Sequence, residues 1–147
     1  MYKVAEVELI YRSKVKASER IKVRASSEAH VVFRQYWNMD KIDLLEDFKV
    51  LFLNRNNRVL GIFNLSSGGV SGTVVDVKLI FSAALKVNAS SIIVCHNHPS
   101  GNLRPSRSDI DITKKVKQAG SILDIALIDH LIITSENYYS MADAGVI

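Results

Sequence analysis

Cysteine is nearly absent from this sequence, and proline and tryptophan are scarce. Among 147 residues there are one Cys, at position 95, two Pro and one Trp. A single cysteine excludes an intramolecular disulfide and any zinc site built from several thiolates, so zinc fingers and redox dithiols are ruled out. A hydrophobic fraction of 48% in a chain of this length is enough for a core that needs neither a disulfide nor a structural metal.

Long apolar runs are absent as well. No stretch approaches the roughly 18 consecutive apolar residues of a membrane-spanning helix. The first residues, Met-Tyr-Lys-Val-Ala-Glu, lack the apolar run and cleavage site of a secretory signal. We therefore expect a soluble, cytoplasmic protein without a membrane partner.

Charge of one sign is only slightly in excess. The chain has 19 Lys and Arg against 15 Asp and Glu, a net charge of +4, and residues 1–40 hold 8 of the basic and 5 of the acidic residues. Such a charge permits weak attraction to polyanions but supplies no groove or aromatic platform for nucleic acid. We interpret it as a solvated surface and keep DNA as an open alternative.

The first half of the chain shows strand and helix patterns. Alternation over residues 4–11 and 20–24 predicts extended segments, and residues 26–37 predict a helix capped by Ser26 or Ser27. Two apolar runs, 44–53 and 59–65, flank an asparagine-rich turn and predict a hairpin.

The second half alternates helices and strands. Asp76 is a candidate N-cap for a helix, residues 91–95 form a short buried strand, and a second helix starts near Ser106 and stops at Gly120. Residues 122–133 supply one or two further strands. This order predicts an α/β fold, of the α+β kind, with a mixed sheet flanked by helices. We expect one domain over residues 1–147, with 1–40 as an N-terminal extension and 41–147 as the catalytic core.

Two histidines follow the strand at 91–95. His96 and His98 are two residues apart in an extended segment, so their side chains project to the same side and can share one ion. Asp109, on the first turn of the next helix, can fold back over them. Two imidazoles and one carboxylate leave a fourth tetrahedral position for water, as in catalytic rather than structural zinc sites.

A structural interpretation competes with the metal site. His-x-His pairs are common, and Ser106-Arg-Ser-Asp109 has the spacing of a helix capping box. The capping box accounts for Ser106 and Asp109 without an ion. It does not account for two histidines at a strand end followed by a Pro-Ser-Gly turn.

These residues carry a family resemblance. His96-x-His98, then seven residues, Ser106, two residues and Asp109 match the JAMM (MPN+) metalloprotease signature without a gap. The string His-Asn-His-Pro-Ser-Gly, with Asp129-His130-Leu-Ile-Ile, resembles the RadC family, whose name is associated with DNA repair. The similarity runs from about Glu46 to Ile147. It implies a JAMM/MPN-type, cytidine-deaminase-like sandwich.

The resemblance also implies roles for individual residues. His96, His98 and Asp109 would bind one Zn²⁺ per chain, and Ser106 would stabilise the developing oxyanion. Glu46, which precedes an apolar strand, would be the general base, and a carboxylate at that place can reach a metal-bound water; neighbouring Asp47 is the competing choice. The implied reaction is hydrolysis of an amide, in a peptide or isopeptide, with a protein or peptide as substrate.

The alternative function is a DNA repair or recombination accessory that binds without peptidase activity. Residues 1–40 contain no Gly-x-Gly hairpin of the helix-hairpin-helix module that full-length RadC proteins resemble, so DNA contact through such a module is not expected. The sequence does not indicate whether the protein is a monomer or an oligomer.

Four further residues have mainly structural interpretations. Cys95 should point away from the face of His96 as a buried thiol, His130 is expected in the core or beside the metal ligands, and His30 in a helix. For Asn97, lining the cleft and shaping the turn both remain open.

Overall fold

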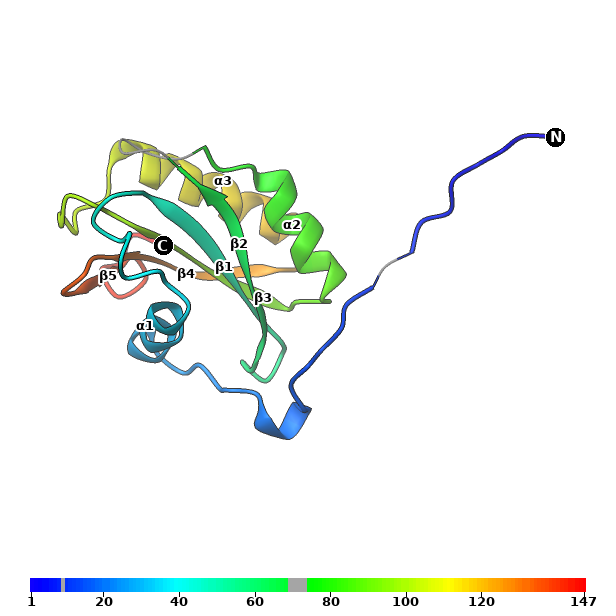
Figure 1. The fold of residues 1–147 in the computed structure, drawn as a ribbon, viewed down its shortest axis with the longest axis horizontal. Coiled ribbons are helices and arrows are strands. Elements are labelled where there is room, and N and C mark those ends of the chain that lie inside the picture. The colour runs from blue at the N-terminus through cyan, green and yellow to red at the C-terminus, as the bar shows by residue number, and fades with distance from the viewer. Residues whose placement is uncertain (9, 69–73) are drawn as a thin grey trace.

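A five-stranded mixed sheet organises the chain. The computed structural model describes residues 1–8, 10–68 and 74–147, and its strand order is β2-β1-β3-β4-β5 (Figure 1). Its helices and strands are η1 (Ala17–Glu19), α1 (Ser26–Gln35), β1 (Asp47–Leu53), β2 (Val59–Ser67), α2 (Val77–Lys86), β3 (Ser91–Asn97), α3 (Arg107–Ile122), β4 (Ala126–Ile133) and β5 (Tyr138–Ser140).

The strand directions confirm the mixed α/β fold. β1 and β2 form the expected antiparallel hairpin, whose turn contains Asn57 at φ 56°, a conformation that asparagine tolerates better than most residues. β3 pairs antiparallel with β1 and parallel with β4. The parallel pair needs a crossover, and α3 supplies it.

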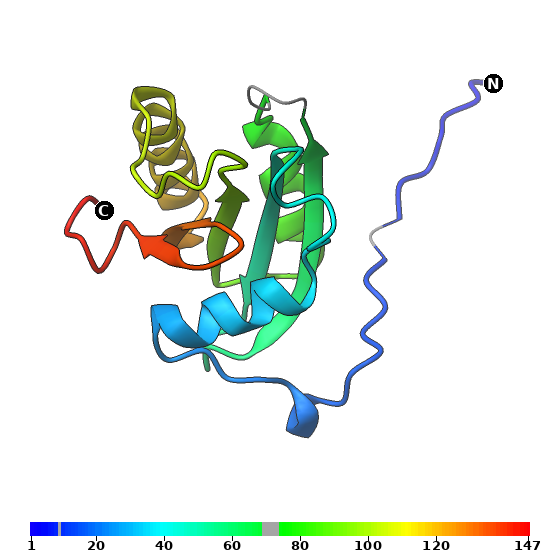
Figure 2. The same ribbon diagram turned by 60° about the vertical axis from the view of Figure 1, so that its left-hand side comes forward.

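Helices cover both faces of the sheet. Figures 1 and 2 show α1 on one face and α2 with α3 on the other. Successive β1 side chains point to opposite faces: Leu51 and Leu53 join the cluster around α1, whereas Phe48, Val50 and Phe52 join the cluster under α2 and α3. A helix in the first forty residues therefore contributes to the same core as the sheet.

The N-terminal predictions were partly wrong. α1 begins at Ser26 after Ala25 as N-cap, without a side-chain cap, because the Ser26 hydroxyl bonds Asp143 instead. Among described residues, the segment 4–11 forms no strand, and 20–24 contributes one isolated bridge, between Lys22 and Arg58. An alternating pattern forms a strand only where a partner strand accepts its hydrogen bonds.

α3 does not stop at Gly120 as predicted. The helix continues to Ile122, and Asp124, at φ 56°, reverses the chain after it. Gly120 serves close packing instead, since a Cβ at this position would lie 2.2 Å from the carbonyl oxygen of Ile125.

Replacement of Gly120 by alanine should therefore destabilise the protein, even though alanine is the better helix former. We expect a loss of about 1–3 kcal/mol in the free energy of unfolding, typical of overpacking. Urea unfolding measures it, with Ser121→Ala, at an exposed position, as the control. Equal or greater stability of Gly120→Ala would contradict the packing argument.

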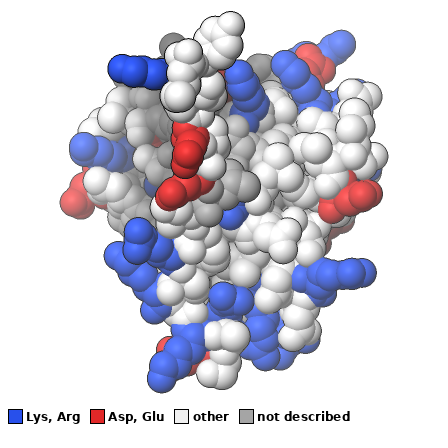
Figure 3. All heavy atoms as spheres, turned by 90° about the vertical axis from the view of Figure 1, so that its right-hand side faces the viewer, with Lys and Arg blue, Asp and Glu red and all other residues white. Residues whose placement is uncertain are grey.

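The face shown in Figure 3 carries side chains of both charges. Lys and Arg side chains lie in separate groups over the face shown in Figure 3, with Asp and Glu between them. Among the described residues, no helix has both the length and the apolar character needed to span a membrane.

Candidate metal centre

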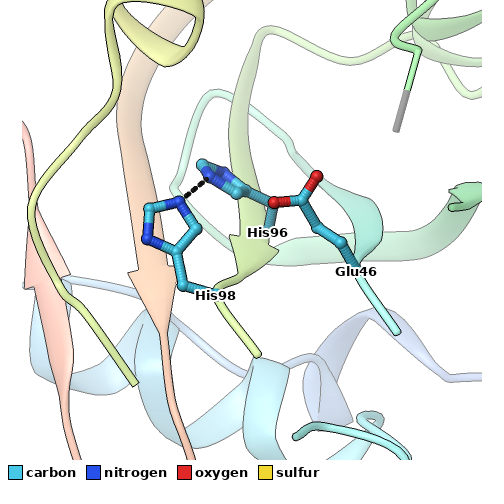
Figure 4. Close-up of side chains that lie close together, drawn as sticks. All are labelled: Glu46, His96 and His98. Atoms are coloured by element: carbon cyan, nitrogen blue, oxygen red, sulfur yellow. Dashed lines mark hydrogen bonds between the residues drawn. The ribbon is translucent and has the colours of Figure 1, made fainter. Parts of the chain in front are cut away.

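The pairing of β1 with β3 brings the candidate residues together. Phe48 pairs with His96, so two residues beyond this pair Glu46 and His98 face each other across the strand ends. Side chains two apart in a strand share a face, which places Glu46, His96 and His98 on the α3 side. Figure 4 shows the three side chains converging, and one ligand atom from each lies within 4.8 Å of the others.

Asp109 completes the cluster from the first turn of α3. Its Oδ1 lies 3.2 Å from His96 Nε2, and its Oδ2 lies 3.1 Å from His98 Nε2. The two Nε2 atoms are 3.0 Å apart. The structure therefore brings all three predicted metal ligands together, although the sequence separates Asp109 from His98 by ten residues.

The donor chemistry fits a cation at this point. His98 Nδ1 lies 2.6 Å from the carbonyl oxygen of Asn102, which only accepts, so Nδ1 carries hydrogen. The Nε2 lone pair of a neutral His98 then faces the Asp109 carboxylate and His96. Such acceptors repel one another unless a proton or metal ion lies between them. Two imidazoles and a carboxylate suit zinc, but the arrangement does not identify the metal.

Ionisation at the site follows from these contacts. The hydrogen bond to Asp109 raises the pKa of His98. Burial opposes the charged form of Asp109, but hydrogen bonds from His96 and His98 hold the pKa of its carboxyl well below its usual range. Asp109 is thus an ionised carboxylate that can accept hydrogen bonds from protonated histidines or bind a metal ion. Protons and metal ions compete for these donor atoms.

A buried chain of hydrogen bonds supports His96 from behind. His96 Nδ1 is 2.7 Å from His130 Nε2, and His130 Nδ1 is 2.6 Å from Thr113 Oγ1, which donates to the Asp109 carbonyl oxygen. Burial lowers the pKa of His130 well below its usual value. Partners of this kind orient metal-binding histidines, and His130 has this position relative to the predicted ligand His96. The sequence predicted Thr113 as an inward-facing helix residue, which is confirmed, but it indicated no role for Thr113 beside the histidines.

Ser106 caps α3 with its hydroxyl and also contacts Asp109 through its backbone N–H. Its hydroxyl accepts from Asp109 N at 3.0 Å, while Asp109 Oδ2 accepts from Ser106 N at 2.8 Å. The capping box is therefore present, and it holds the same Asp109 carboxylate that meets the histidines. The two interpretations of Ser106 and Asp109 are compatible. Since the hydroxyl accepts from Asp109, its own hydrogen is free for another group.

A cleft of about 280 Å³ opens beside the cluster. The residues that line it are Glu46, Phe48, Val74, Val75, His96, Ser108, Asp109 and Ile112. The apolar members come from β1, α3 and the residues before α2, and their sequence patterns resemble ordinary core patterns. The Ser-Ser-Gly-Gly sequence at 66–69 predicts a loop, but Ser66 and Ser67 are the last residues of β2, and Gly69 lies outside the described residues.

Cys95 and His30 lie away from the cleft. Cys95 is buried in the cluster around α1, on the opposite face from His96 as predicted, and burial raises the pKa of its thiol well above its usual value. His30 stacks on Tyr138, with ring centroids 4.3 Å apart. Neither side chain reaches the candidate metal centre.

The sequence is similar to those of known proteins. A family model described as RadC-like JAB domain matches residues 23–146; it begins inside the segment expected to be an extension. A UPF0758 protein of Flavobacterium johnsoniae is 54% identical over 101 residues, which is 69% of this chain and 44% of that protein. UPF0758 proteins of Porphyromonas gingivalis (47% over 103 residues; 69% and 45%) and Desulfitobacterium hafniense (37% over 119 residues; 81% and 51%) are also similar. The chain spans about half the length of these relatives.

Proposed function

The chain belongs to the RadC-like JAB domain family, and from this premise we propose that it is a zinc-dependent hydrolase that cleaves an amide bond in a peptide or isopeptide. JAB domains include metalloproteases, and the metal-ligand geometry suits the same chemistry. The single observation that carries the proposal is the meeting of both His Nε2 atoms with the Asp109 carboxylate, at 3.1–3.2 Å, on the wall of an open cleft.

Each residue has a distinct role in the proposed reaction. His96, His98 and Asp109 would hold the metal, and Zn²⁺ at such a site polarises a carbonyl and lowers the pKa of water. Glu46, on the cleft wall within 4.8 Å of the two histidines, takes a proton from the attacking water and returns it to the leaving amine. The Ser106 hydroxyl donates to the oxygen of the scissile carbonyl as that oxygen becomes negative.

The two carboxylates receive different roles because their contacts differ. Glu46 can be grouped with the histidines as a ligand. Asp109, however, contacts both Nε2 atoms directly and is fixed by the capping box. A metal ligand must lie among the other donor atoms, as Asp109 does, whereas a general base must reach both the water and the leaving group. We therefore assign Asp109 to the metal and Glu46 to proton transfer.

Hydrolysis tests the proposed function. We expect the zinc-loaded chain to cleave members of a proteome-derived peptide library in H₂¹⁸O, with one ¹⁸O in each new carboxylate, measured by mass spectrometry. A chelator should abolish cleavage and added zinc should restore it. A library left intact by protein that holds stoichiometric zinc would contradict the proposal.

The alternative function, DNA binding without hydrolysis, finds no support in the cleft. Its described lining includes the carboxylates of Glu46 and Asp109 and no Lys or Arg side chain. Carboxylates repel phosphate, and nucleic-acid sites are basic. We therefore propose a peptide or protein as the substrate of this site.

A further inference from the structure

Asn97, between the two histidine ligands, turns its side chain to the opposite side from them. It is fully buried at 0% exposure. Its Nδ2 donates to the carbonyl oxygens of Ile42 and Leu45, both at 2.8 Å, and its Oδ1 accepts from Asp47 N at 2.7 Å. Ile42 and Leu45 lie in the segment that leads into β1, and Asp47 is the first residue of β1.

These hydrogen bonds surround Glu46. Leu45 and Asp47 are its immediate neighbours, so one amide fixes the backbone on both sides of it. The amide orientation is unambiguous, because both carbonyls need the N–H groups and the Asp47 N–H needs the oxygen. The carbonyl oxygen of Glu46 is in turn bound by Gly68 N. The Glu46 backbone is thus held from β3 and from the end of β2.

The Asn97 side chain links the histidines of the proposed site to Glu46. His96 and His98 lie on either side of Asn97 in β3, and Glu46 lies in the segment that Asn97 binds. We propose that Asn97 is a positioning residue, whose side-chain amide holds the carboxylate of Glu46 at the metal centre. The inference rests on the proposed role of Glu46 as general base.

Neither aspartate nor alanine can replace Asn97 at these three hydrogen bonds. Aspartate has the same shape but no N–H groups, so it leaves the Ile42 and Leu45 carbonyls unpaired and brings a buried charge towards them. Alanine leaves all three backbone groups without a partner. In either variant the segment before β1 is free to shift, and a displacement of about 1 Å at a catalytic group can cost 100-fold in rate.

Kinetics of the zinc-loaded chain separate positioning from general stability. We expect Asn97→Ala to lower kcat by about 100-fold, with KM and zinc affinity close to those of the native protein. Val32→Ala, in the α1 core, is the control: it should lower the urea midpoint but leave kcat unchanged. A kcat for Asn97→Ala close to the native value would overturn the proposal.

A double variant identifies the residue through which Asn97 acts. Residues that act as a unit have non-additive effects. In a Glu46→Gln background, therefore, adding Asn97→Ala should lower kcat by less than about twofold further. A full additional 100-fold loss would show that Asn97 acts on something other than Glu46 and would overturn the proposal.

Crystal structures provide a readout that does not need activity. In Asn97→Ala the Glu46 carboxylate should withdraw from the histidine donors, which lie within 4.8 Å of it in the native chain, while His96, His98 and Asp109 keep their positions. If Glu46 stays in place, the positioning role is wrong. This result decides the inference even if the native chain cleaves no peptide, which would contradict only the proposed function.

Discussion

Glu46→Gln is expected to lower the rate of amide hydrolysis by a factor of about 10²–10⁴, the usual contribution of a general base. Glutamine keeps the shape of the side chain but cannot take a proton from water. Because Glu46 is not assigned to the metal, zinc content should remain at one ion per chain. Single-turnover kinetics and metal analysis of the same preparation measure both quantities.

Asp47→Asn is the matched control for this variant. Asp47 follows Glu46, and its backbone N–H, not its carboxylate, makes the contact with Asn97. It should retain most of the native rate. If Asp47→Asn loses activity while Glu46→Gln keeps it, the base has been assigned to the wrong carboxylate. If Glu46→Gln loses zinc, Glu46 is a ligand.

Replacing Asp109 should weaken zinc binding more than replacing a residue that only supports a ligand. Removal of a residue that merely supports a ligand costs roughly 10–100-fold in metal affinity, and loss of a ligand should cost more than this. Asp109→Asn is the more informative variant, since its side-chain oxygen can still accept from Ser106 N and keep the helix capped. Competition with a chromophoric chelator measures the affinity.

Asp111→Asn serves as the control on the same helix. Asp111 is largely exposed and pairs with Arg107 at 3.7 Å, so its loss should leave zinc affinity unchanged. Native-like affinity in Asp109→Asn and Asp109→Ala would show that the carboxylate caps α3 and does nothing more. The competing capping interpretation of Ser106 and Asp109 would then be sufficient.

Spacing in the sequence indicated that His96, His98 and Asp109 could meet at one site, and the family resemblance assigned them to a metal. His96 and His98 share a face because they are two apart in a strand, and Asp109 follows a serine that caps the next helix. Both features depend only on residues that are close in the sequence, through the alternation of side chains in a strand and the capping of a helix. The family resemblance also pointed to Glu46, and its position just before β1 places it at the end of a buried strand, beside the histidines at the end of β3.

The supporting residues could not be predicted because they depend on distant partners. Thr113 reaches His130 across 17 residues, and Asn97 reaches Asp47 across 50. On its own, Thr113 has only the pattern of a buried helix position. The same reasoning explains the error at Ser26, whose hydroxyl bonds Asp143, 117 residues away, rather than the start of its own helix.

The most direct measurement is anomalous X-ray diffraction from crystals of the zinc-loaded chain, recorded on both sides of the zinc absorption edge. The account predicts one anomalous peak per chain, within bonding distance of His96 Nε2, His98 Nε2 and an Asp109 carboxylate oxygen, with Glu46 outside that distance. No peak between these three side chains, or a peak bound by Glu46 in place of Asp109, would contradict it.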